Sequence, residues 1–346
     1  MKAIVLCAGF GRRLRPLTDI WPKPALPLLG APLFRYTLAI LKRAAITQVG
    51  MNTHHLHHTM ETIASEECAS IGLSLTVSHE ALHIQGTAGG IRGLRHFVGN
   101  GDFVALNGDS LYALDLQPII DAHRKSNAAA TMALLPMPRG EQYGAVEIDE
   151  MGNVRRIAGL GPGGGKSLTA WHFSGIHVMS PVVFDFMATA GPEDLNHHVY
   201  LRMLEAGLRI QGHLLPHFNA YMSDVGAPHR YAATHQRLLC GTVPCEYFGS
   251  ISPFLETPRG AGHFWAHPSA QLNDARLEGP AWFGAGCFLE AGVCVGAEVS
   301  VGPGASIEAG ANINRVAVLN GARVPRGKVI EDAIVFGDAH IVSTRQ

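Results

Sequence analysis

The chain has 346 residues, of which 47% are hydrophobic and 16% are charged, and its formal net charge is −1. This composition excludes a disordered chain and a chain that wraps nucleic acid, because it combines much apolar surface with almost no net charge. The length predicts a sizeable core and two domains. The six cysteines form no Cys-x-x-Cys pair, which indicates reduced core residues of a cytoplasmic protein. No stretch approaches the ~20 apolar residues of a membrane helix, and the opening apolar run is too short for a signal peptide.

The opening stretch joins an apolar run to a cationic loop. Residues 2–8 are apolar and partly β-branched, which predicts a buried strand. Gly9 and Gly11 then let the backbone approach a ligand, and arginines 12, 13 and 15 supply charge, so the loop suits a polyphosphate. It is not a P-loop, because Gly-Lys-Ser/Thr is absent, and it is not a dinucleotide fingerprint, because residue 14 is leucine.

Helix and strand alternate after this loop. We expect helices over 31–45, 59–70 and 89–97, and strands over 48–52, 73–78 and 102–107. This alternation predicts an α/β fold with a doubly wound, mainly parallel sheet, whose ligands bind beyond the carboxyl ends of the strands. Shorter strands are expected over 130–135, 144–148, 154–157 and 170–177.

Two polar segments lie near the expected strand ends. Asp109, in Asn107-Gly108-Asp109, follows a buried strand, where a carboxylate can hold Mg²⁺ among phosphate oxygens. An ordinary turn is an equally good interpretation of these three residues. The glycines of residues 85–90 permit close approach to a flat base, although a structural turn would contain the same residues.

Four histidines occur within residues 54–58. Spacings of three and four could place two imidazoles on one helix face for zinc, but no third ligand is evident nearby in the sequence. The pattern therefore favours the solvated start of a helix.

The C-terminal part has a six-residue period. Apolar residues recur at 277, 283, 289, 295, 301, 307, 313 and 319, and a small or β-branched residue precedes each by two positions. This period predicts a helix of parallel strands with three short sides per coil, about four coils long. We expect a first domain over 1–240, a proline-containing linker over 241–262 and the repeat domain over 263–346. A short repeat of this kind packs on the first domain or on another subunit, so we expect a homo-oligomer, a dimer or higher.

The opening motif resembles a known signature. Leu6-Cys-Ala-Gly9-Phe-Gly11-Arg-Arg13-Leu-Arg-Pro16-Leu-Thr with Pro22-Lys23-Pro24 resembles that of the sugar-1-phosphate nucleotidylyltransferases (nucleotide-sugar pyrophosphorylases). Arg12 departs from the usual small or acidic residue. Residues 86–89, Gly-Thr-Ala-Gly, resemble the segment of mannose-1-phosphate guanylyltransferases, and the hexapeptide pattern resembles the left-handed β-helix appended to many of these enzymes and found also in acyltransferases.

The resemblance extends to Asp224. Tyr221-Met-Ser-Asp224-Val-Gly226-Ala-Pro228 is close to the family's Trp-x-Asp-Ile/Val-Gly-Thr-Pro, which contains its second metal ligand. The family's Glu-Lys-Pro is missing, and Lys166 is a candidate substitute for its lysine.

The resemblance implies a set of site residues. The implied catalytic residues are Arg13, Lys23 and Asp109, and the implied Mg²⁺ ligands are Asp109 and Asp224. The implied nucleotide-binding residues are Leu6, Ala8, Gly9, Gly11, Arg12, Arg13, Gln85, Gly86, Thr87 and Asn107. The implied sugar-phosphate-binding residues are Gly144, Glu147, Lys166, Ser174 and Gly175.

We therefore expect a Mg²⁺-dependent enzyme that makes an NDP-sugar and pyrophosphate from an NTP and a sugar 1-phosphate, with no nucleic acid or membrane partner. GTP with mannose 1-phosphate is the first expectation. The alternatives are UTP, dTTP or CTP with another hexose, heptose or N-acetylhexosamine 1-phosphate, an acyltransferase centred on the repeat, and a non-catalytic regulatory subunit that binds nucleotide sugars.

Overall fold

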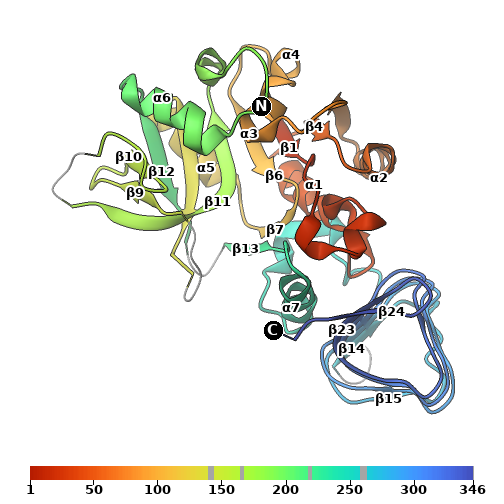
Figure 1. Cartoon of the computed structure of the whole chain (residues 1–346). Coiled ribbons are helices and arrows are strands. Elements are labelled where there is room, and N and C mark those ends of the chain that lie inside the picture. The colour runs from red at the N-terminus through yellow and green to blue at the C-terminus, as the bar shows by residue number, and fades with distance from the viewer. Residues whose placement is uncertain (139–143, 164–166, 217–219, 258–262, 346) are drawn as a thin grey trace. The chain divides into compact units, whose positions relative to one another are not determined.

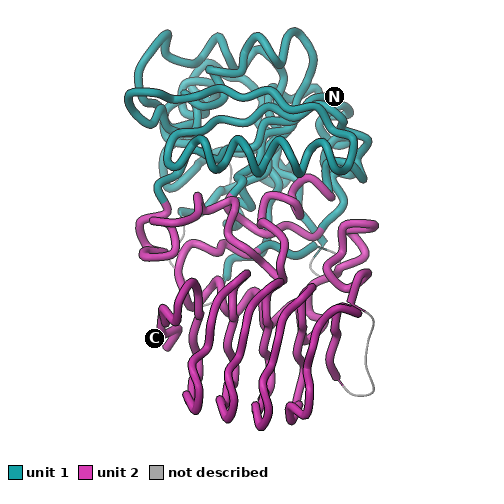
Figure 2. The backbone as a smooth tube through the Cα atoms, turned by 90° about the vertical axis from the view of Figure 1, so that its right-hand side faces the viewer, with its two compact units in different colours: residues 1–10, 40–108, 114–222 teal, residues 11–39, 109–113, 223–346 magenta. Residues whose placement is uncertain are grey.

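The computed structural model describes residues 1–138, 144–163, 167–216, 220–257 and 263–345 (Figure 1). The chain divides into two compact units, coloured separately in Figure 2. Unit 1 comprises residues 1–10, 40–108 and 114–222, and unit 2 comprises residues 11–39, 109–113 and 223–346. None of the helices in the described ranges is both long enough and apolar enough to cross a membrane.

Unit 1 is built on a sheet with a mainly parallel core. Its strand order is β10-β9-β11-β6-β1-β4-β5, with β8 beside β11 and β12 beside β8. The strands are β1 (Lys2–Leu6), β4 (Gln48–Thr53), β5 (Ser74–His79), β6 (Phe103–Asn107), β8 (Ala130–Leu135), β9 (Val146–Ile148), β10 (Val154–Ile157), β11 (Thr169–Met179) and β12 (Ile210–Leu214). Strands β6, β1, β4 and β5 run parallel, whereas β11 is antiparallel to β6, β8 and β9. The apolar run that predicted β1 is buried, as expected for a strand inside a parallel sheet.

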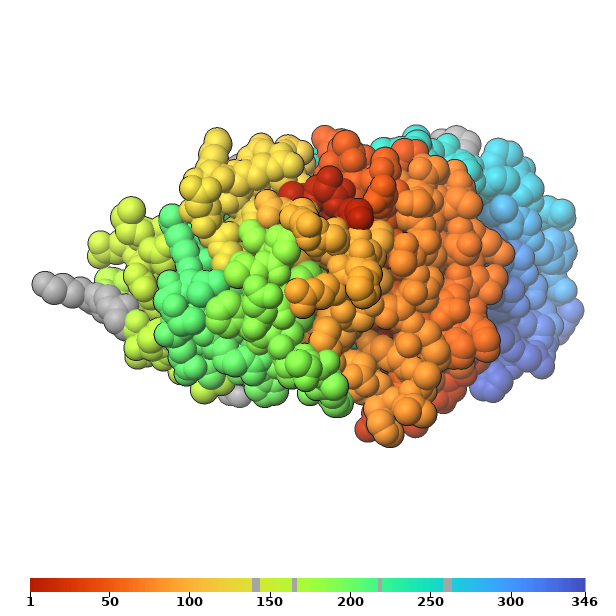
Figure 3. Space-filling model, turned by 90° about the horizontal axis from the view of Figure 1, so that it is seen from above, coloured from red at the N-terminus to blue at the C-terminus, as the bar shows by residue number. Residues whose placement is uncertain are grey.

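Helices connect and cover these strands. They are α2 (His57–Ser70), α3 (Gly86–Arg92), α4 (Arg95–Val98), α5 (Gln117–Ser126) and α6 (Tyr200–Glu205), with the 3-10 helix η4 (Pro181–Phe186) and the π-helix η5 (Leu195–Val199). Helix α1 (Leu33–Arg43) spans the boundary between the units. Helix α3 packs on η5, which continues into α6, and Figure 3 shows orange side chains from the region of α3 beside green ones from the region of α6. Side chains from the sheet and from α3, α4, η4, η5 and α6 form one apolar core.

The expected helix over 89–97 is wrong in its extent. The structure has two short helices there, because Leu94 leaves the helical conformation with φ −106° and ψ 13°. Gly93, just before it, packs closely on β5: a Cβ at this position would lie 2.6 Å from the Ser78 hydroxyl. Close packing against β5 thus accompanies a break that the apolar periodicity does not reveal.

Unit 2 begins with the segment 11–39, which contains three short helical turns and a small hairpin. These are η1 (Arg12–Leu14), η2 (Leu17–Asp19), η3 (Lys23–Ala25), β2 (Pro27–Leu28) and β3 (Ala31–Pro32). Further along the chain come β7 (Ser110–Ala113), β13 (Tyr221–Asp224), α7 (Pro228–Leu239) and η6 (Cys245–Ile251). The C-terminal strands are β14 (Phe264–Ala266), β15 (Arg276–Leu277), β16 (Ala281–Phe283), β17 (Phe288–Leu289), β18 (Cys294–Val295), β19 (Val299–Val301), β20 (Ser306–Ile307), β21 (Asn312–Val318), β22 (Arg323–Val324), β23 (Val329–Phe336) and β24 (His340–Ser343).

The C-terminal strands stack as coils of parallel strands, drawn in blue in Figure 1. Arg276 pairs with Cys294, Ala281 with Val299, and Phe288 with Ser306, so these strands lie beside strands eighteen residues later. In the following coil the offset is seventeen residues, as in the pair of Val301 and Val318. The apolar positions of the six-residue period point inward: residues 283, 289, 295, 301, 307 and 313 are all fully buried. Only the last strand, β24, runs antiparallel to its neighbour β23. The six-residue period is therefore the packing period of this core as far as Ile313. Beyond it the core positions are Val318 and Val324, so the prediction of Leu319 as the next inward position is wrong by one residue.

The opening segment of unit 2 packs against its C-terminal coils. Asn320 Nδ2 donates a hydrogen bond to the carbonyl oxygen of Gly30 at 3.1 Å. Gly30 has φ +78°, and a Cβ there would lie 2.7 Å from the ring of Trp282. Only glycine combines this backbone conformation with so close an approach.

Candidate active site

Lys23 is the centre of a charged cluster in unit 2. Its side chain is only 6% exposed, and its ammonium donates to Asp109 Oδ2 at 2.8 Å and to Asp224 Oδ1 at 3.1 Å. Prolines 22 and 24 flank Lys23 in η3 and restrict the backbone there. Asp109 lies just before β7 and Asp224 ends β13, which are neighbours in a two-stranded sheet. Two carboxylates that are 115 residues apart in the sequence therefore converge on one cation.

Two arginines complete the cluster around Asp224. Arg230 Nη1, from α7, donates to Asp224 Oδ2 at 3.0 Å, and Arg13 Nη2 lies 3.8 Å from the same oxygen. Gly226 N donates to Asp224 Oδ1 at 2.9 Å. A Cβ on Gly226 would lie 2.6 Å from Arg13 Nη2, so glycine at this position gives the arginine room.

The cluster has three cations for two carboxylates. Burial by itself raises the pKa of Asp224, but Lys23, and then Arg13 and Arg230, outweigh it and hold that pKa below its usual value. Asp224 is therefore ionised at neutral pH, and among the described residues three cationic side chains lie beside the two carboxylates. Such an arrangement attracts phosphate groups.

The donor set fits a magnesium ion. Carboxylate oxygens are the protein ligands that Mg²⁺ takes, usually one or two of them together with phosphate oxygens and water. The Lys23 ammonium lies between Asp109 and Asp224, which shows that the two carboxylates surround a position suited to a small cation. Both carboxylates also keep some solvent exposure, 40% and 23% of their side chains, so a ligand can reach them.

In unit 1, a chain of hydrogen bonds links the carboxyl ends of three strands. Leu6 lies in register with Asn52 on one side and Asn107 on the other. Cys7 N donates to Asn52 Oδ1 at 2.8 Å, and Asn52 Nδ2 donates to Glu80 Oε1 at 2.8 Å. The other oxygen of Glu80 accepts from Gln85 N at 2.6 Å. Asn52 and Glu80 thus position the turn at Gln85, and the sequence analysis missed both.

The turn at residues 85–87 is closely packed. Gly86 has φ +70°, and a Cβ there would lie 2.5 Å from the carbonyl oxygen of Glu193. The hydroxyl of Thr87 accepts from Leu195 N at 2.7 Å and lies 3.3 Å from Asp194 Oδ2. The backbone of this turn is therefore fixed by η5, which follows more than a hundred residues later.

The residues of the glycine loop differ in exposure. Ala8 is buried, whereas Gly9 is exposed. Gly11 has φ +60°, and its carbonyl oxygen accepts from the Thr18 hydroxyl at 2.9 Å. Arg12 and Arg13, in η1, are both exposed at the surface of unit 2.

The described residues expected to bind the sugar phosphate lie on two segments of unit 1. Gly144 precedes β9 and is exposed, and Glu147 in β9 accepts from Arg156 Nη1 at 3.4 Å. Ser174 and Gly175 are buried at an irregularity in β11, where the pairing with β8 changes register. Lys166 lies outside the described residues.

The structure thus brings together four of the expected residues, Arg13, Lys23, Asp109 and Asp224, and adds Arg230 to them. No local pattern marks Arg230 as a site residue. Its only sequence signal is its position, in the first turn of the helix that follows Asp224.

Comparisons with known proteins identify a sequence family and several relatives. The sequence model of the family described as nucleotidyl transferase matches residues 2–239. A UTP–glucose-1-phosphate uridylyltransferase from Synechocystis is 26% identical over 85% of this chain and 76% of that protein. A probable mannose-1-phosphate guanylyltransferase from rice, Oryza sativa, is 27% identical over 85% of this chain and 79% of that protein.

A solved structure shares the fold. It is a putative glucose-1-phosphate thymidylyltransferase from Bacillus anthracis in complex with a sucrose. The match has a TM-score of 0.57 and 22% sequence identity, and it covers 68% of this chain and 93% of that one.

Proposed function

The chain belongs to the nucleotidyl transferase family, and from that premise we propose that it joins a nucleoside triphosphate to a sugar 1-phosphate and releases pyrophosphate, with Mg²⁺ as its cofactor. The observation that supports this most directly is the convergence of Asp109 and Asp224 on Lys23, with Arg13 and Arg230 beside them. Two carboxylates beside three cationic side chains are what a site for two phosphate-bearing substrates and a divalent cation requires.

The reaction we propose needs no protein base. An oxygen of the sugar phosphate, already ionised at neutral pH, forms a bond to the α-phosphorus, while the bond from that phosphorus to the pyrophosphate oxygen breaks on the opposite side. Arg13 stabilises the charge that develops on the leaving pyrophosphate, and Lys23 neutralises phosphate charge. Mg²⁺ held by Asp109 and Asp224 would supply further charge neutralisation. Arg230 holds the Asp224 carboxylate in place.

The remaining residues bind substrates in this proposal. Leu6, Ala8, Gly9, Gly11, Arg12, Gln85, Gly86, Thr87 and Asn107 bind the nucleotide. The buried hydrogen bonds from Cys7 through Asn52 and Glu80 to Gln85 support this part, because they hold the strand ends and the turn as one rigid piece. Gly144, Glu147, Lys166, Ser174 and Gly175 bind the sugar phosphate.

The substrates we propose first are GTP and mannose 1-phosphate. Residues 86–89 support this choice, because they match the segment that mannose-1-phosphate guanylyltransferases have. The Synechocystis relative, named as a uridylyltransferase, favours UTP with glucose 1-phosphate as the second choice. After these two pairs we rank dTTP or CTP with another hexose, heptose or N-acetylhexosamine 1-phosphate.

We further propose that the C-terminal coils form a left-handed β-helix of hexapeptide repeats over 263–346, joined by a linker over 241–262 to a catalytic domain over 1–240. Pairing of strands eighteen residues apart supports this, because three six-residue sides make one coil. The exposed end of this β-helix would form the interface of a homo-oligomer. We also propose that the enzyme is located in the cytoplasm.

The test is pyrophosphate release over a grid of four NTPs and several sugar 1-phosphates, with Mg²⁺. We expect one productive pair for the wild type, and loss of Mg²⁺-dependent activity in Asp109→Asn. Asp185→Asn is the matched control, because that carboxylate is 65% exposed and lies in unit 1. Arg13→Ala and Lys23→Ala should each slow turnover by about 10²–10³-fold or more with the fold intact.

Retained activity in Asp109→Asn would remove the metal assignment. If no substrate pair in the grid releases pyrophosphate, but nucleotide sugars still raise the melting temperature, the protein is a regulatory subunit that binds nucleotide sugars and not an enzyme. The missing Glu-Lys-Pro is the observation that keeps this second function open.

A further inference from the structure

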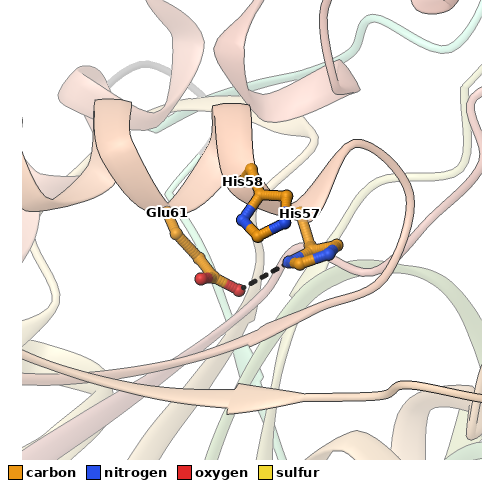
Figure 4. Close-up of side chains that lie close together, drawn as sticks. All are labelled: His57, His58 and Glu61. Carbon is orange, nitrogen blue, oxygen red and sulfur yellow. Dashed lines mark ion pairs between the residues drawn. The ribbon is translucent and has the colours of Figure 1, made fainter.

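The histidine-rich start of α2 contains a cluster that the proposed reaction does not use. His57, His58 and Glu61 each offer one ligand atom, and these atoms all lie within 4.8 Å of one another (Figure 4). Glu61 is the third donor that the spacing of the histidines alone did not reveal. It lies one helical turn after His57, on the same face of the helix.

The distance between two of these donors already suits a metal. His57 Nδ1 lies 3.4 Å from Glu61 Oε1, as the dashed line in Figure 4 marks. Two ligands bound tetrahedrally to zinc, each about 2.1 Å from it, are separated by about 3.4 Å. His57 Nδ1 is also buried and makes no hydrogen bond within the described residues; its partner there is the Glu61 carboxylate of that ion pair, which is the second proposed ligand.

The neighbours of the cluster orient it. The Thr53 hydroxyl, at the end of β4, donates to Glu61 Oε1 at 2.8 Å. Metal ligands commonly have such a second partner, which fixes their direction. The ring of His79, at the end of β5, is tilted by 36° to that of His57 with the centroids 4.0 Å apart, and its Nδ1 lies 4.0 Å from Glu61 Oε1. The cluster is thus built from α2 together with two strand ends.

We propose that His57, His58 and Glu61 bind one divalent transition-metal ion of the zinc class, with a fourth position open to water. Imidazole with a carboxylate suits Zn²⁺, Cu²⁺ or Ni²⁺, whereas Mg²⁺ prefers oxygen ligands alone. The donor chemistry therefore separates this site from the Asp109 and Asp224 pair. Because the ligands are brought together only in the folded chain, the metal stabilises the fold.

The experiment measures zinc binding by protein that has no affinity tag, in competition with a chromophoric chelator, together with the melting temperature with and without Zn²⁺. We expect one zinc ion per wild-type chain and a higher melting temperature. Glu61→Gln, which keeps the size of the side chain, and His57→Gln should each weaken binding at least 10- to 100-fold, roughly the loss for outer partners of a metal site.

Two controls locate the binding. His96→Gln changes an exposed histidine on α4, and Asp109→Asn changes the proposed magnesium site; both should bind zinc as the wild type does. Absence of zinc uptake by the wild type overturns the proposal. So does equal binding by Glu61→Gln and His57→Gln, or an equal loss in His96→Gln.

A second measurement decides the matter if the cluster variants fail to fold. Co²⁺ bound by nitrogen ligands in a tetrahedral site has strong visible absorption, which can be recorded on the wild type. Its appearance at one equivalent supports the site, and its absence overturns it.

Discussion

Replacing Lys23 by methionine removes the ammonium between Asp109 and Asp224 and keeps an unbranched apolar stem. Breaking a fully buried ion pair costs about 3–5 kcal/mol, and an exposed pair is worth about 0–1 kcal/mol. Lys23 is 6% exposed, but its two partners are 40% and 23% exposed, which screens them. We therefore expect Lys23→Met to lower the free energy of unfolding by about 2–3 kcal/mol, or the melting temperature by roughly 4–6 °C.

Magnesium should reverse part of this loss. Without the ammonium, Mg²⁺ no longer competes with Lys23 for the two carboxylates, so it should bind the variant more tightly than the wild type. At a hundred times its dissociation constant, a ligand adds about 2.7 kcal/mol. Melting curves over a Mg²⁺ series measure this, with Lys125→Met, an exposed lysine on α5, as the control within about 0.5 kcal/mol of the wild type.

Two results would refute this reasoning. One is a melting temperature of Lys23→Met equal to that of the wild type in the absence of Mg²⁺. The other is a Mg²⁺ response that persists unchanged in the double variant Lys23→Met, Asp109→Asn, because the cation would then bind elsewhere.

Three further predictions concern stability. Burial lowers the pKa of His177 to about 3, so below pH ~6.5 only the unfolded chain takes up this proton. As the pH decreases below ~6.5, this residue should therefore lower the free energy of unfolding by about 1.4 kcal/mol per pH unit. His177→Gln should remove that slope from denaturation curves measured at pH 5–7. Gly86→Ala should destabilise the protein more than Gly99→Ala. Both glycines have positive φ, which costs an alanine about 1–2 kcal/mol, but only at Gly86 would the added Cβ also clash. Equal melting temperatures of the two variants would contradict this. Ile307→Ala should lower the free energy of unfolding by about 2–5 kcal/mol. Val329 is 71% exposed, so Val329→Ala should change that free energy by no more than about 0.5 kcal/mol. Equal losses would show that Ile307 is not a core residue.

The sequence predicted features whose signal is local or periodic. The strand β1 is a continuous apolar run, and the C-terminal coils repeat one apolar position every six residues, so both follow from the order of residues alone. The resemblance named Asp109 and Asp224 as partners, and the structure places both at Lys23.

Features that depend on distant partners had no such signal. Asn52 and Glu80 are buried polar residues whose role appears only when β1, β4 and the turn at Gln85 are side by side. Glu61 is a different case, because it lies only four residues after His57, so its i,i+4 spacing was a local signal that the histidine pattern alone did not include. The helix break at Leu94 accompanies the close packing of Gly93 against β5, a contact that the apolar periodicity does not show.

The hydrogen bond from Asn320 to Gly30 has a consequence for synthesis on the ribosome. The two residues are 290 positions apart, and translation adds about 5–20 residues each second, so the opening segment leaves the ribosome about 15–60 s before this partner exists. Trp282, which packs on Gly30, also arrives late. Lys23 and its neighbours in the sequence therefore remain incompletely folded for most of the chain's elongation. Unit 2 completes its fold only when the last coils emerge.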